Sequence, residues 1–125
     1  MTDLTELSSR IEIIERGYEY LLAYAAQGRQ DDQGTEARAR LTEMFATLNG
    51  LGELFAKVTV GSGAAPVVVG PFLDAVKQDA AKARGAIGLV LSRPAIGSLL
   101  VDNLNASIHL RALLTDCFLV EQAFK

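Results

Sequence analysis

The chain is poor in the residues on which metal and redox chemistry depends, with one cysteine, one histidine and no tryptophan among its 125 residues. Cys117 has no second cysteine with which to form an internal disulfide, which favours a reducing cytoplasm. A structural zinc site needs four Cys or His ligands, a di-iron bundle needs paired Glu-x-x-His units, and a covalent haem needs Cys-x-x-Cys-His. We therefore expect no metal or cofactor, the formal alternative being a non-covalent haem held by His109 with Met1 or Met44.

Clustered positive charge and long apolar runs are scarce as well. The Lys and Arg residues are scattered, and the net charge is −3. Because nucleic-acid binding needs grouped cations, we expect no nucleic-acid partner. The longest uncharged stretch, 58–73, contains glycines and prolines that indicate a loop, and Arg93 and Pro94 interrupt another apolar run. The first sixteen residues are charged where a signal peptide would be apolar. These features predict an acidic, cytoplasmic protein without a membrane span.

Apolar residues are abundant, at half of the chain, and they recur at steps of three and four. That spacing predicts amphipathic helices, and 125 residues suit a single domain, 1–125. Asp3, followed by Glu6, has the spacing of a helix-capping box, and "VGSGAAPVVVG" (60–70), including "PVVVG", is interpreted as a loop. We expect a mainly antiparallel four-helix bundle, with helices over about 3–27, 35–58, 70–91 and 95–124.

The last predicted helix carries two apolar seams where a surface helix needs one. The first seam comprises Leu99, Asn103, Ala106, Leu110, Leu113, Cys117, Val120 and Phe124, and the second comprises Val101, Leu104, Ile108, Ala112, Thr115 and Leu119. Asn103 is a polar residue in the first seam, where such a residue typically sets register or oligomeric state. The second seam predicts a homodimer, because a self-complementary face is most often covered by a second copy. Two alternatives remain: a central helix in a monomer, or a face that binds a different protein. The predicted interface residues are Val101, Leu104, Ile108 and Leu119.

Several polar and aromatic side chains are candidate contacts for a ligand or partner. Tyr20 and Tyr24 lie one turn apart, a pattern that fits either a partner surface or the rim of the core. His109 belongs to a polar strip that indicates either a hydrated helix edge or the start of an acid–base site. Arg84 and Asn103 could add polarity to a pocket beside the small residues of the third predicted helix.

The first predicted helix, "LTELSSRIEIIERGYEYLLAYAAQGR", resembles the opening helix of the all-helical chorismate mutases. The shared features are its long amphipathic form and arginines near both ends. The resemblance implies a small helical enzyme, but it covers one helix of four. Arg10 directly precedes Ile11, out of that family's register. The family is therefore not assigned.

Two functions follow from these patterns, and we expect the first. It is a non-enzymatic helical protein that binds or assembles with a partner protein, as an adaptor, assembly factor or dedicated chaperone, with no catalytic residues. The alternative is a bundle that binds a small ligand, or a small helical enzyme, with a pocket near Arg84, Asn103 and His109. A chamber on the order of a few hundred Å³ with converging polar groups would favour the second, and a dry, filled core the first.

Overall fold

The computed structural model describes residues 2–61, 63–108 and 110–124, and this part of the chain is helical without strands. The all-helical class is thus confirmed, but the described residues form six helices where the periodicity predicted four. The second predicted helix is divided near Gly50, and the fourth is described as two helices on either side of residue 109, which lies outside the described residues. The helices are α1 (Asp3–Ala25), α2 (Ala37–Leu48), α3 (Leu51–Gly61), α4 (Pro66–Leu91), α5 (Ser98–Ile108) and α6 (Leu110–Phe124).

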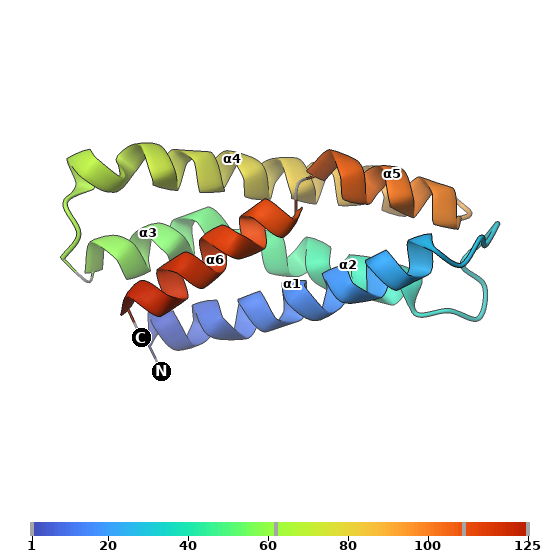
Figure 1. The fold of residues 1–125 in the computed structure, drawn as a ribbon, viewed down its shortest axis with the longest axis horizontal. Helices are drawn as coiled ribbons and strands as arrows, with labels where there is room; N and C mark the ends of the chain where they lie inside the picture. Colours follow the sequence, from blue (N-terminus) through green and yellow to red (C-terminus); the bar gives the residue numbers. More distant parts are fainter. Residues whose placement is uncertain (1, 62, 109, 125) are drawn as a thin grey trace.

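The helices run back and forth along the long axis of the molecule (Figure 1). Helix α1 runs one way, α2 and α3 return, α4 runs out again, and α5 and α6 return to the end where both termini lie. Helices α1 and α4 each pack against α2, α3, α5 and α6. The core is the apolar space between α1 and α4, closed on its two sides by the other four helices.

The core is filled by aliphatic and aromatic side chains from all six helices. On α1 the fully buried residues include Leu7, Ile14 and Leu21, one heptad apart, so that one stripe of the helix faces inward as the sequence predicts. Tyr24 and Phe55 are the largest side chains that are fully buried. This packed interior supplies the main stabilisation of the fold, since burial of apolar surface is the dominant favourable term in folding.

The second predicted helix is divided at Gly50, which lies between α2 and α3 and has φ of 73°. This left-handed conformation suits glycine and ends α2 after the extended Asn49. Gly52 has a different role, because a Cβ placed there would lie 2.9 Å from the side chain of Lys77. Gly52 thus allows α3 to approach α4 closely.

One helix begins earlier than the sequence predicts, and another has a different capping residue. Helix α4 starts at Pro66, so "PVVVG", interpreted above as loop, forms its first turns and Pro71 lies inside the helix. Proline suits the first helical position, where no hydrogen-bonded N–H is needed. Helix α1 is capped by Thr2, whose hydroxyl accepts a hydrogen bond from the Thr5 N–H at 3.1 Å. Asp3 is therefore the first residue of the helix, and its predicted role as the cap is wrong.

The last predicted helix is divided into α5 and α6, and the buried face differs between them. In α5 the buried residues include Val101, Leu104 and Ile108 from the second seam, whereas Asn103 of the first seam is exposed. In α6 the buried residues, among them Leu113, Cys117 and Val120, belong to the first seam. Each half therefore buries one seam, which explains why the sequence displays two.

This arrangement corrects the predicted dimer interface. Val101, Leu104 and Ile108 are buried in the core of their own chain and offer no surface to a second copy. Leu119 is the exception, with 60% of its surface exposed. Helix α5 instead resembles the alternative of a central helix in a monomer, because it packs against both α1 and α4.

A polar network joins the α1–α2 loop to the connection between α4 and α5. Asp32 accepts hydrogen bonds from the Ile96 N–H at 2.9 Å and from Arg38 Nε at 3.1 Å. Arg38 also donates to the carbonyl oxygens of Leu91 and Arg93, at the C-terminal end of α4. This carboxylate thereby contributes to holding two distant loops together, beside the backbone hydrogen bond from the Ser98 N–H to the Arg29 carbonyl oxygen.

We expect acid to weaken this connection. The hydrogen bond from Ile96, followed by that from Arg38, lowers the pKa of Asp32 below its ordinary value of 3.8. Because the pKa is lower in the folded than in the unfolded chain, the stabilisation is complete above about pH 4 and is lost as the pH falls through the folded-state pKa. Asp32→Asn should lower the free energy of unfolding by about 1 kcal/mol near neutral pH and by less near pH 3. Urea titrations at both pH values measure the difference, and an unchanged gap would contradict the role of the carboxylate.

Candidate functional site

The two candidate tyrosines serve the fold in this structure. Tyr24 is fully buried, and its hydroxyl donates to the carbonyl oxygens of Ile96 at 2.6 Å and Asp31 at 3.0 Å. Tyr20 is half-buried, stacks on Tyr24 with ring centroids 6.1 Å apart, and accepts a hydrogen bond from the Glu36 N–H. Tyr24 is thus unavailable to a partner, and the arrangement matches the rim-of-core alternative.

Of the predicted pocket residues that the structure describes, Arg84 and Asn103 do not line the same hollow. The guanidinium of Arg84 lies 3.9 Å from the centre of the Phe45 ring, and its Nε donates to the Phe45 carbonyl oxygen. Arg84 lines a hollow of about 290 Å³ between the α2–α3 junction and α4, together with Ala81 and Gly85. Asn103 does not line this hollow but is exposed on α5, and His109 lies outside the described residues. Arg84 therefore borders a hollow without Asn103, and the part of the predicted site that concerns His109 stays a prediction.

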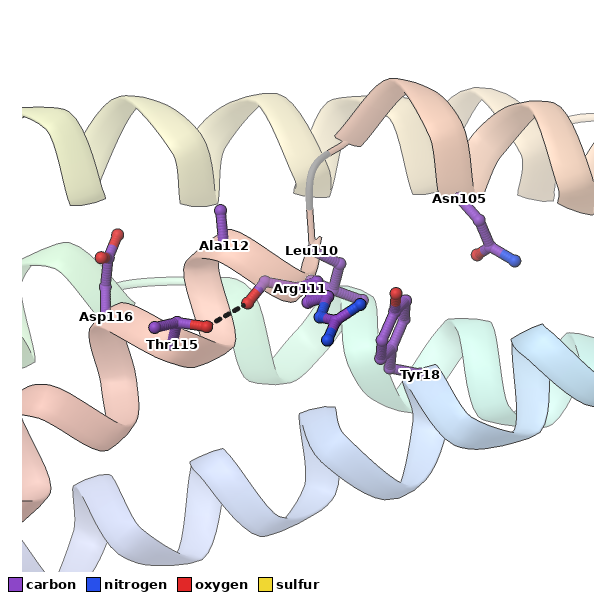
Figure 2. A pocket seen from close by; sticks show the side chains of 7 residues that line it. All are labelled: Tyr18, Asn105, Leu110, Arg111, Ala112, Thr115 and Asp116. Atoms are coloured by element: carbon purple, nitrogen blue, oxygen red, sulfur yellow. Dashed lines mark hydrogen bonds between the residues drawn. The ribbon is translucent and has the colours of Figure 1, made fainter.

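A larger hollow, of about 560 Å³, lies where α1 meets α5 and α6. We call it the Tyr18 pocket (Figure 2). Its polar side chains come from three helices: Tyr18 from α1, Asn105 from α5, and Arg111 with Asp116 from α6. In the close-up, Arg111 reaches toward Tyr18, Asn105 extends from α5 on the other side of Tyr18, and Asp116 lies on the far side of Arg111. The lining residues are Tyr18, Asn105, Leu110, Arg111, Ala112, Thr115 and Asp116.

The polar atoms of this pocket have unused hydrogen-bonding capacity. Asn105 donates from Nδ2 to the Leu21 carbonyl oxygen at 3.3 Å, but its Oδ1 is buried without a hydrogen-bond partner in the described part of the chain. Among the described residues, the Tyr18 hydroxyl and the Arg111 guanidinium also take part in no hydrogen bond or ion pair. A buried polar atom without a partner costs about 1–3 kcal/mol, so Asn105 favours a bound hydrogen-bond donor.

Asp116 and Cys117 of α6, in or next to this pocket, both have a pKa above the ordinary value for their residue type. Burial, and then the negative charge of Asp79, raises the pKa of Asp116. Burial raises the pKa of the Cys117 thiol to about 12. A nucleophilic cysteine needs a lowered thiol pKa, so Cys117 is a neutral core residue at neutral pH.

A second, apolar hollow of about 340 Å³ lies at the end of the molecule where α3 ends, α4 begins and α6 ends. We call it the terminal groove. Val67, Val68 and Leu119 expose 88%, 73% and 60% of their surfaces at this end. The interpretation of 60–70 as a loop gives no indication of this groove, although the run of three valines was the available signal. Its lining residues are Thr59, Ala64, Val68, Val69, Phe72, Leu119, Val120, Ala123 and Phe124.

Two further searches bear on the class of protein. Within 2–61, 63–108 and 110–124, no three or more His, Cys, Asp or Glu residues gather closely enough to hold a metal ion. The same residues include no helix with the length and apolar character needed to cross a membrane. The described fold is thus helical, with the polar Tyr18 pocket, the apolar terminal groove and a smaller hollow beside Arg84 at its surface.

No protein-family model, curated protein or solved structure matches this chain.

Proposed function

We propose that this protein is a non-enzymatic, cytoplasmic helical protein that binds a protein partner through the terminal groove. The observation that supports the proposal is the concentration of exposed aliphatic side chains around an apolar hollow. Val67, Val68 and Leu119 stand beside a groove floored by Phe72 and Val120. A contiguous apolar patch on a protein surface marks an interaction site more often than scattered apolar residues do.

The occupant that we propose is a second copy of the chain. The groove is concave, while the first turn of α4 carries Val67 and Val68 outward at its edge. A surface with both a hollow and a projecting apolar edge can pair with itself about a two-fold axis. The dimer predicted from the sequence is kept in this form with Leu119 in the interface, while the buried Val101, Leu104 and Ile108 leave it.

Leu119→Asp is expected to convert the dimer into folded monomers. A carboxylate at this exposed position costs the monomer little, but in the dimer it would be buried without a partner. Light scattering coupled to size exclusion should give twice the 13.4 kDa of one chain for the unmodified protein and 13.4 kDa for the variant. Leu89→Asp is the matched control, because Leu89 is 68% exposed and does not line the groove. It should leave the dimer intact.

Site-specific photo-cross-linking tests the same surface without assuming the partner. A photoreactive side chain at position 119 should yield an adduct of two identical chains in cells, and the same group at position 89 should yield none. An adduct with a different protein would support partner binding but contradict the homodimer. The absence of any adduct at position 119, together with a 13.4 kDa species in solution, would contradict the proposed function.

A further inference from the structure

We infer that the Tyr18 pocket is a binding site for a small carboxylic acid that carries a hydroxyl or amino group near its carboxylate. The inference is independent of the terminal groove, because the two linings share no residue. It rests on the unpartnered polar atoms of Tyr18, Asn105 and Arg111, which three separate helices bring to one hollow. The pocket volume of about 560 Å³ lies within the range of small-molecule sites.

Arg111 and Tyr18 specify the carboxylate. A guanidinium is a planar fork of donors that matches the two oxygens of a carboxylate, and a phenol adds a further O–H donor. Arg111 and Tyr18 line the same pocket, and in Figure 2 the side chain of Arg111 reaches toward Tyr18, so both can face one ligand. Arg111 is exposed to water, which weakens each charged contact by screening and hydration. We therefore expect an affinity in the millimolar range rather than tight binding.

Asn105 is the reason that we expect a hydroxyl or amino group near the carboxylate of the ligand. Its Nδ2 is already engaged by the Leu21 carbonyl oxygen, so the atom left for a ligand is Oδ1, which accepts but cannot donate. A ligand that satisfies this oxygen must offer an O–H or N–H group. A simple carboxylate without such a group would leave the buried oxygen unpaired.

The negative charges of Asp116 and of the whole chain further restrict which ligands the pocket can bind. Asp116 lines the same pocket, with Asp79 close enough to affect its titration, and the chain carries a net charge of −3. These negative charges oppose an ion with two or more negative charges, such as phosphate at neutral pH. A monocarboxylate or a zwitterion meets less repulsion, and the ammonium of a zwitterion is attracted to this side of the pocket.

The test is ligand-observed NMR with defined probes: L-lactate, L-serine, lactamide, serinamide, propionate and inorganic phosphate. Lactamide and serinamide lack only the carboxylate, and propionate lacks only the hydroxyl of lactate. We expect saturation transfer to lactate or serine at millimolar concentration. Binding should be weaker by about tenfold or more for the matched amides and for propionate.

Variants connect that signal to the pocket. Arg111→Gln and Tyr18→Phe should each reduce the binding of lactate or serine by about tenfold, since each removes one contact to the carboxylate. Arg93→Gln is the matched control, because Arg93 is an exposed arginine outside the pocket lining, and it should bind as the unmodified protein does. Thermal unfolding by circular dichroism confirms that the variants are folded.

Three results would overturn the inference. One is the absence of saturation transfer to both lactate and serine. Another is equal binding of the acids and their amides, and the third is binding that survives both Arg111→Gln and Tyr18→Phe. None of these outcomes depends on the terminal groove, so they leave the proposed partner binding untouched.

Discussion

Leu104→Glu is expected to unfold the protein. Leu104 exposes 4% of its surface and belongs to the core between α1 and α4. Removing a buried leucine side chain costs about 2–5 kcal/mol, and a buried carboxylate without a partner adds a further penalty. Together these costs are comparable to the whole stability of a typical domain, about 5–15 kcal/mol. Circular dichroism at 222 nm, recorded during urea titration, should show lost or non-cooperative helical structure.

Leu99→Glu is the matched control on the same helix. Leu99 is 74% exposed, so the substitution should change the free energy of unfolding by about 0.5 kcal/mol or less. A Leu104→Glu variant that stayed folded and became monomeric would contradict the burial of Leu104. It would instead support the interface that the second seam of the sequence predicted.

Tyr24→Phe should lower the free energy of unfolding by about 1–3 kcal/mol. The substitution removes the donor that serves the carbonyl oxygens of Ile96 and Asp31, and the contact with Ile96 is buried. Burial raises the pKa of the Tyr24 phenol, so the hydroxyl remains protonated and able to donate over the whole neutral range. Chemical denaturation of both proteins measures the difference.

Tyr20→Phe is the control for Tyr24→Phe, because it removes the hydroxyl of the other ring in the same stacked pair. The Tyr20 hydroxyl accepts a hydrogen bond from the Glu36 N–H, and that contact is exposed, so water can replace it. We expect a loss of about 0.5 kcal/mol or less. Equal losses for the two variants would contradict the view that burial of the Tyr24 bond, rather than the presence of a hydroxyl, provides the stabilisation.

The periodicity of apolar residues predicted those helices that bury the same stripe of side chains along their whole length. In α1 the steps of three and four persist from Leu4 to Leu21, and the observed helix ends within two residues of the predicted end. Gly28, a residue type that commonly ends helices, has φ of 66° just beyond it. A helix of this kind is predictable because its pattern, its breaker and its buried stripe are all local properties of the chain.

The break that divides the second predicted helix into α2 and α3 was not predictable in the same way. Gly50 and Gly52 look alike in the sequence, yet Gly50 ends a helix and Gly52 lies in the next one against Lys77. A glycine costs about 1 kcal/mol relative to alanine inside a helix, which is too little to decide between these outcomes. Packing against α4 decides them, and that packing depends on residues far along the chain.

The sequence by itself determined that the protein is all-helical, that it is acidic and that its last segment carries two apolar seams. Only the tertiary structure decided which seam is buried: the second in α5, with Leu104, and the first in α6, with Cys117. The Tyr18 pocket likewise required Asn105 and Arg111 to meet a tyrosine from α1. Periodicity is a property of a single helix, whereas burial and the meeting of side chains depend on the neighbours that each helix face acquires on folding.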